Sequence, residues 1–115
     1  MIHLNIGSNL KSKYGSKIDN INIAINLLIE SKIKITRISK FYETPSYPNN
    51  RNPKFLNVGL VSKFEGSYFE LMKRIQLIEK KLGRVKTQKN DPRIIDIDII
   101  DFKKIIKKSN KLTLP

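Results

Sequence analysis

The sequence predicts an α+β fold in a single domain that spans residues 1–115. Two segments carry apolar residues at helical spacing, and four segments have the length and β-branched composition of strands. Their order along the chain is β-α-β-β-α-β. This order is the split arrangement of the ferredoxin-like fold, in which an antiparallel sheet carries both helices on one side. A length of 115 residues suits one domain with one hydrophobic core.

The first half of the chain is predicted to form a strand, a helix and a second strand. Residues 3–6 form the first strand, and residues 32–42 form the second, with a bulge where the alternation shifts at Ile38. Between them Ser16 can cap a helix. The apolar positions of this helix follow a period of 3.6 residues: Ile18, Ile21, Ala24, Ile25, Leu28 and Ile29. The prolines and asparagines of residues 44–53 predict a loop.

The second half is predicted to form a strand, a helix and a last strand. Residues 55–64 alternate as a strand, and Ser67 with Glu70 forms a capping box. The helix that follows ends at Gly83. Its apolar positions are Leu71, Ile75, Ile78 and Leu82. Residues 84–93 form a basic loop, residues 94–102 form the fourth strand, and the segment after it is a charged hairpin or irregular.

Composition excludes several kinds of site. The chain has no cysteine and one histidine, so thiolate chemistry is excluded and a His-based metal site is not expected. No apolar run is long enough to span a membrane, and the first residues do not resemble a signal peptide, so a cytoplasmic protein is expected. The net charge of +13 agrees with nucleic-acid binding, but also with a coding bias toward lysine, because 18 of the 23 basic residues are Lys.

Two aspartates interrupt the apolar last strand. Asp96 and Asp98 are two residues apart, so their side chains leave the same face with Cα atoms about 7 Å apart. Paired carboxylates of this kind can hold Mg²⁺ together with water and phosphate oxygens. The alternative to a metal site is a solvent-facing pair, or one that forms salt bridges to lysine. Arg93 and the basic loop enter the strand at the same end, which favours a nucleotide site.

Other polar and aromatic positions are open to two interpretations. Gly7-Ser8-Asn9 lacks the spacing of a phosphate-binding P-loop and is by itself a turn. Asn57, in the middle of a strand, needs hydrogen-bond partners if it is buried, and it could contact a heterocycle. Glu79 is either a solvated helix charge or a nucleotide contact. Three aromatic residues could form a slot for a flat ligand or belong to the core and loops: Tyr42, Tyr47 and Phe55.

Taken together, these pieces resemble the 6-hydroxymethyl-7,8-dihydropterin pyrophosphokinase family of the folate pathway. The matching stretches are GSN at 7–9, FYETP at 41–45, FLN at 55–57, IEKKLGR at 78–84, PRIIDIDI at 92–99 and LTLP at 112–115. They span nearly the whole chain, and PRIIDIDI carries the most specific part of the resemblance. The ferredoxin-like fold is also the fold that the resemblance implies.

The resemblance implies a transferase that moves the terminal diphosphate of ATP to the pterin hydroxymethyl group and releases AMP. Asp96 and Asp98 would bind two Mg²⁺ ions, and Arg84 and Arg93 would contact the polyphosphate. The residues implied around the nucleotide are Gln76, Glu79, Ile99, Lys111 and Thr113. Those implied around the pterin are Thr44, Pro45, Phe55 and Asn57. The expected partners are therefore small molecules, with no membrane, and the expected state is a monomer.

The resemblance also bears on the end of the chain. Members of the resembled family continue past LTLP, so the domain 1–115 is expected to be C-terminally truncated, marginally stable and a poor catalyst.

The rival function from another class is a small basic RNA-binding module, which shares this topology. Such modules stack bases on aromatic residues of the central strands, whereas this chain offers isoleucines and acids there, and acids repel a phosphate backbone.

Overall fold

The computed structural model describes residues 1–45, 53–84 and 93–103. In chain order its elements are β1 (Ile2–Ser8), α1 (Lys17–Glu30), β2 (Lys34–Ile38), β3 (Tyr42–Thr44), β4 (Phe55–Lys63), α2 (Tyr68–Lys81) and β5 (Asp96–Phe102). The predicted order of strands and helices is confirmed, with one short strand, β3, in addition.

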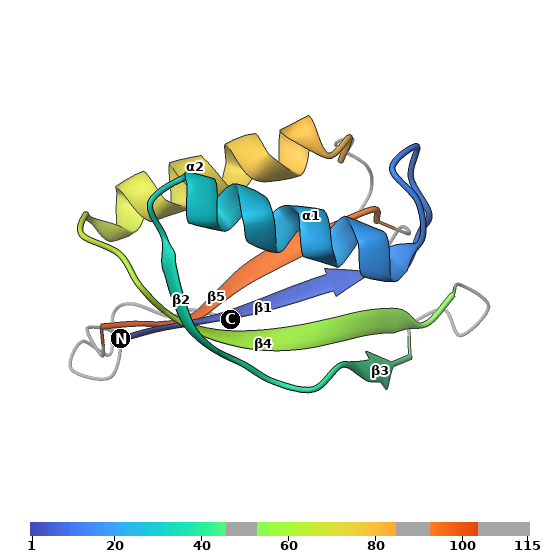
Figure 1. The fold of residues 1–115 in the computed structure, drawn as a ribbon, viewed down its shortest axis with the longest axis horizontal. Helices are drawn as coiled ribbons and strands as arrows, with labels where there is room; N and C mark the ends of the chain where they lie inside the picture. The colour runs from blue at the N-terminus through green and yellow to red at the C-terminus, as the bar shows by residue number, and fades with distance from the viewer. Residues whose placement is uncertain (46–52, 85–92, 104–115) are drawn as a thin grey trace.

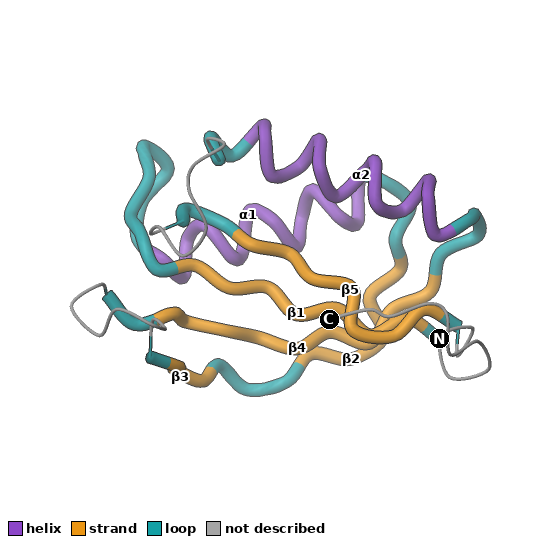
Figure 2. Tube along the Cα trace, turned by 180° about the vertical axis from the view of Figure 1, so that it is seen from behind, coloured by secondary structure: helices purple, strands orange, loops and turns teal. Residues whose placement is uncertain are grey.

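The strands form one antiparallel sheet in the order β2-β4-β1-β5, and β3 pairs with β4 beyond the end of β2. Both helices lie on the same side of this sheet, as Figure 1 shows and the view from behind in Figure 2 repeats. β1 is central, with β4 on one side and β5 at the edge on the other. This arrangement confirms the ferredoxin-like α+β fold.

Both helices begin after the predicted cap residues, Ser16 and Ser67, and each cap is part of a capping box, which was predicted only for Ser67. The Ser16 and Ser67 side chains accept a hydrogen bond from the backbone N–H three residues on, and the Asp19 and Glu70 side chains accept one from the backbone N–H of the cap residue. Such caps stabilise a helix by roughly 0.5–2 kcal/mol each. After α2, Gly83 has φ +97°, the left-handed conformation that glycine adopts without strain and that the predicted C-terminal cap requires.

The predicted apolar stripe of the first helix is partly wrong. Ile18 and Ile29 are 46% and 52% exposed, whereas Asn20 is fully buried. The Asn20 side chain donates to the Leu10 carbonyl at 3.0 Å and to the Ser8 hydroxyl at 3.4 Å. A polar side chain can occupy this inner position because the loop before α1 supplies its hydrogen-bond partners.

The predicted second strand, 32–42, is in fact two strands. The pairing of β2 with β4 shifts register between Ile35 and Arg37, so the bulge lies before the predicted Ile38. Ser39 then bonds to the backbone of Gly59 instead of continuing the ladder, and pairing resumes only in β3. The loop predicted from Thr44 is corrected too, because Thr44 is the last residue of β3 and pairs with Phe55.

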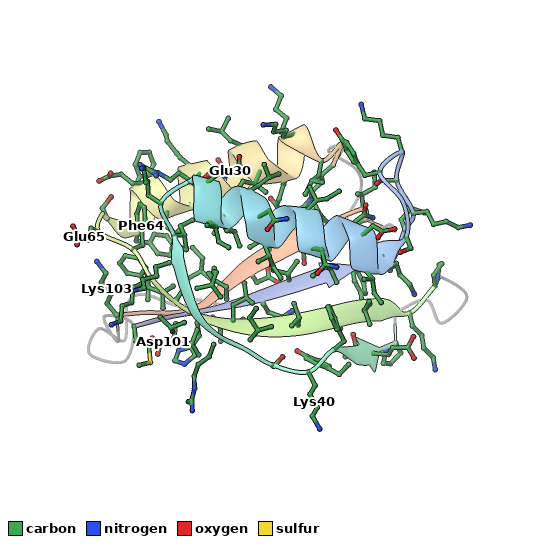
Figure 3. All side chains as sticks on the ribbon, in the orientation of Figure 1. Glu30, Lys40, Phe64, Glu65, Asp101 and Lys103 are labelled. Carbon is green, nitrogen blue, oxygen red and sulfur yellow. The ribbon has the colours of Figure 1, made fainter. Side chains whose placement is uncertain are left out.

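The strands divide their side chains between the two faces of the sheet. Side chains fill the layer between the helices and the sheet (Figure 3). On the helix side β1 buries Ile2, Leu4 and Ile6 completely or almost completely, and β5 buries Ile97 and Ile99. Since neighbours in a strand point to opposite faces, the alternate residues of β1 and β5 are directed to the other face. That face has no helix on it among the described residues.

Candidate active site on the open face of the sheet

The two aspartates of β5 lie on the open face, next to the central strand β1. Asp98 pairs directly with Asn5 of β1, and Asp96 pairs directly with Gly7. Residues opposite each other in an antiparallel pair project from the same face, with side chains close enough to interact. Alternation therefore explains how so apolar a strand carries two acids: its isoleucines pack under the helices and its aspartates do not.

Gly7 separates the acids from the third polar position, Asn57. Asn57 of β4 pairs with Gly7 from the side opposite Asp96. A Cβ atom at residue 7 would lie 2.8 Å from the Asn57 Oδ1 atom and 3.3 Å from the Phe55 ring, closer than ordinary packing allows. The absence of a side chain at Gly7 thus lets the Asn57 amide and the Phe55 ring lie against the backbone of β1.

Two arginines approach Asp96 from the edge of the sheet. Arg84 Nη1 donates to Asp96 Oδ1 at 3.1 Å and to Glu79 Oε2 at 2.6 Å, and Arg93 Nη1 is 3.6 Å from Asp96 Oδ1. Glu79 Oε2 also accepts from the backbone N–H of Ile97 at 2.8 Å. Glu79 therefore satisfies a backbone donor of the edge strand and holds Arg84, which contradicts its interpretation as a solvated charge.

The electrostatics of the acids differ with their partners. Burial, and after it the repulsion from the neighbouring Asp96, together raise the pKa of the Asp98 carboxyl from 3.8 to about 6. Burial likewise raises the pKa of Glu79, against the opposing effect of the Ile97 N–H and Arg84. An added cation at Asp98 would relieve both the lost hydration and the repulsion.

This donor set fits Mg²⁺. Among residues 1–45, 53–84 and 93–103, no group of three or more His, Cys, Asp or Glu side chains is placed to hold a metal ion. Mg²⁺ does not need such a group, because it commonly uses one or two carboxylates and fills its other positions with water and phosphate oxygens. Asp96 and Asp98 are hard oxygen donors on one face, and two positive guanidinium groups lie next to them.

We predict that Asp98→Asn stabilises the metal-free protein at neutral pH. Folding raises the pKa of Asp98, so the native state holds the proton more tightly than the unfolded state does. The free energy of unfolding therefore falls as the pH rises from the unfolded pKa near 3.8 to about 6. Above pH 6 the substitution should raise the free energy of unfolding by roughly 1–2 kcal/mol, after allowance for solvent screening. Urea titrations with a chelator at pH 3.5 and pH 7.5 check this. A gain of the same size at both pH values would contradict it.

The acids and arginines line an open cleft of ≈ 320 Å³ between α2 and β5. The predicted nucleotide residues Gln76, Glu79 and Ile99 line it as well. Lys111 and Thr113 lie outside the described residues. The cleft also includes Tyr68 and Met72, which the sequence analysis did not select. Their spacing from Gln76 and Glu79 along one face of α2 is the sequence signal that could have found them.

The residues predicted around the pterin meet on the same open face. Asn57 Nδ2 donates to Thr44 Oγ1 at 2.8 Å, and Phe55 pairs with Thr44 across β3 and β4. Pro45 follows at the end of β3 and is exposed. Of the three aromatic residues considered for a slot, Tyr42 pairs directly with Asn57, and Tyr47 lies outside the described residues.

The Gly7-Ser8-Asn9 motif links the ends of three segments. Asn9 is 1% exposed, and its Oδ1 accepts from the Arg93 N–H at 2.6 Å while its Nδ2 donates to the Pro53 carbonyl at 3.2 Å. Its own N–H donates to the Arg93 carbonyl at 3.1 Å. Asn9 therefore fixes the backbone position from which the Arg93 side chain extends toward Asp96. The sequence predicted the motif as a turn, which is wrong for Gly7 and Ser8, because they are the last two residues of β1.

These features define a ferredoxin-like domain whose open face carries paired acids and a hydrogen-bonding amide, with two arginines at the adjoining edge of the sheet. The chain belongs to the 7,8-dihydro-6-hydroxymethylpterin-pyrophosphokinase family, whose sequence profile matches residues 3–115. It is 34% identical over 114 residues to the 2-amino-4-hydroxy-6-hydroxymethyldihydropteridine pyrophosphokinase of Aquifex aeolicus. This match covers 99% of this chain and 68% of the Aquifex protein. Family membership confirms the resemblance and does not favour the RNA-binding alternative.

Longer relatives contain a region similar to this chain. It is 32% identical over 114 residues to the folic acid synthesis protein fol1 of Schizosaccharomyces pombe, and 36% identical over 107 residues to the mitochondrial folate synthesis bifunctional protein of Pisum sativum. The matches cover 98% and 92% of this chain. They span 15% and 21% of those two proteins. No helix in the described part of the chain is long and apolar enough to cross a membrane.

Proposed function

We propose that the protein transfers diphosphate from ATP to 6-hydroxymethyl-7,8-dihydropterin and releases AMP, a step of folate biosynthesis. The observation that carries this proposal is the placement of Asp96 and Asn57 on opposite sides of Gly7 on one open face. A flat heterocycle that contacts the amide at Asn57 would direct its hydroxymethyl group toward the acids. The family and the names of its relatives support the same activity.

The charged groups have separate roles in this proposal. The hydroxymethyl oxygen attacks the β-phosphorus of ATP, and the bond from that phosphorus to the oxygen that stays on AMP breaks. Arg84 and Arg93 contact the polyphosphate and stabilise the negative charge that shifts during transfer. Asp96 and Asp98 would hold two Mg²⁺ ions. When bound, these ions neutralise phosphate charge and lower the pKa of the attacking alcohol.

The remaining residues of the site bind and orient the substrates. Gln76, Glu79 and Ile99 line the cleft that would receive the nucleotide, with Lys111 and Thr113 proposed to complete it. Thr44, Pro45, Phe55 and Asn57 would surround the pterin, with the Phe55 ring as a stacking face. Holding the two substrates in one geometry raises the rate, because their translational and rotational entropy is lost on binding and no longer adds to the barrier of the chemical step.

The direct test is an AMP-formation assay with the protein, ATP, Mg²⁺ and 6-hydroxymethyl-7,8-dihydropterin. We expect AMP and the pterin diphosphate in equal amounts, and no AMP when the pterin is omitted or when EDTA is added. Calorimetry with the pterin and a non-hydrolysable ATP analogue measures binding independently of turnover. Protein that forms no AMP and binds neither ligand would overturn the proposed function.

We predict that Asn57→Ala weakens pterin binding tenfold to a hundredfold. The change removes directional hydrogen bonds and leaves polar groups of the bound heterocycle unpaired, which costs on the order of 1–3 kcal/mol. Calorimetry in the presence of the ATP analogue measures the effect. Asn26→Ala, at an exposed position of α1, is the matched control and should bind as the original protein does. An unchanged affinity in Asn57→Ala would remove Asn57 from the site.

A further inference from the structure

We infer that Asn5 is a positioning residue that determines substrate specificity by fixing the direction of the Asn57 amide. The inference rests on the proposed function, since it concerns the heterocycle of that same site. Asn5 lies on the open face of β1, between Asp98 of β5 and Gly59 of β4. Because Gly59 has no side chain, the Asn5 side chain is free to extend diagonally toward Asn57.

Asn5 is the second member of a hydrogen-bonded row that crosses three strands. The Tyr42 hydroxyl donates to Asn5 Oδ1 at 2.8 Å, and Asn5 Nδ2 donates to Asn57 Oδ1 at 3.2 Å. Asn57 Nδ2 then donates to Thr44 Oγ1 at 2.8 Å. The Asn57 amide is therefore held at both ends, its oxygen by β1 and its nitrogen by β3.

The direction of this row is a physical property of the site. An amide oxygen only accepts and an amide nitrogen only donates, so turning Asn57 alone would set its NH₂ group against that of Asn5. Turning both amides would be tolerated by the hydroxyls at the two ends, which can donate or accept. The Phe55 carbonyl, 3.4 Å from Asn57 Nδ2, can only accept and so favours the observed direction.

The row leaves Asn57 with one accepting and one donating function for a ligand, in a fixed order. Its Oδ1 keeps a second lone pair, and the second hydrogen on its Nδ2 has only the long contact to Phe55. A 2-aminopteridine presents a donor, the amino group, beside an acceptor, ring nitrogen 1. A 2-oxopteridine presents an acceptor beside a donor, which is the reversed order. Asn5 should therefore favour the amino compound over the oxo compound.

The test compares Asn5→Leu, which keeps the size of the side chain but removes its hydrogen bonds, with the exposed Asn26→Leu on α1. Calorimetry measures the binding of 7,8-dihydropterin and 7,8-dihydrolumazine, its 2-oxo counterpart, with Mg²⁺ and a non-hydrolysable ATP analogue. In Asn5→Leu we expect dihydropterin to bind about tenfold more weakly and dihydrolumazine to bind as before or better. The ATP analogue should bind within about twofold of the original value, and Asn26→Leu should change nothing.

A second readout needs no ligand. In the ligand-free protein, NMR should show slowly exchanging side-chain amide hydrogens for Asn57, and faster exchange in Asn5→Leu. Tyr42→Phe removes only the hydroxyl that orients Asn5 and should reduce the preference for dihydropterin about threefold. This milder variant carries the test if Asn5→Leu does not fold.

The outcomes separate this inference from the proposed function. If the original protein binds dihydropterin and Asn5→Leu keeps the same preference between the two pteridines, the role of Asn5 is wrong and the proposed function stands. An equal loss of both pteridines, with unchanged Asn57 amide signals, would also overturn it. If the original protein binds neither pteridine, the proposed function fails first, and the inference with it.

Discussion

Asp96→Asn and Asp98→Asn are each expected to reduce diphosphate transfer about a thousandfold or more, the loss expected when metal-assisted charge stabilisation of several kcal/mol is removed. The two carboxylates leave the same face of β5 beside the arginines, so each is proposed to hold Mg²⁺ against the polyphosphate. Asparagine keeps the shape of the side chain but lacks the charge that attracts the ion. AMP formation at saturating ATP and pterin, with Mg²⁺ varied, measures the effect.

Binding and folding controls decide what such a loss means. Pterin binding without the nucleotide should change little, because Asn57 and Phe55 are on other strands. Asp101→Asn is the matched control on the same strand, because Asp101 pairs with His3 at the far end of β5. It should keep most of the activity. Activity within a few fold of the original in both Asp96→Asn and Asp98→Asn, with circular dichroism unchanged, would show that the metal assignment is wrong.

Arg84→Met is expected to lower both stability and activity. Arg84 is the shared partner of Glu79 and Asp96, whose side chains are 11% and 21% exposed. Removing the cation leaves two largely buried acids near each other, and breaking such pairs costs about 2–3 kcal/mol at these partly exposed positions. The lost contact to the polyphosphate should reduce the rate a further hundredfold, about 3 kcal/mol of transition-state stabilisation. Urea unfolding and AMP formation measure the two effects.

A double-variant comparison separates the two roles of Arg84. Adding Glu79→Gln to Arg84→Met should recover much of the stability, because an uncharged amide no longer needs the cation, but it should recover none of the activity. Acid pH should also reduce the stability loss of the single variant, because burial already raises the pKa of Glu79 and protonation removes its charge. Recovery of the rate in the double variant would contradict a polyphosphate contact for Arg84.

Local sequence signals were sufficient wherever neighbours in the chain decide the structure. Ser16 as a cap and Ser67 with Glu70 as a capping box place both helix starts, because these motifs involve residues only three apart. Alternation in IIDIDII places Asp96 and Asp98 on one face for the same reason. The split of residues 32–42 into β2 and β3 was missed, since the break is made by Ser39 bonding to Gly59 on another strand.

The sequence by itself determined the order of the elements and the ferredoxin-like class. Through PRIIDIDI and the other matching stretches it also determined the family. Only the tertiary structure decided which polar groups lie together. Asn5, Gly7, Asp96 and Asn57 are far apart in the chain and meet because the strand registers place them in neighbouring positions. Glu79 is buried rather than solvated because β5 brings the Ile97 N–H to it. Spacing fixes the face from which a side chain projects, but its neighbours across the sheet depend on pairing, which adjacent residues do not encode.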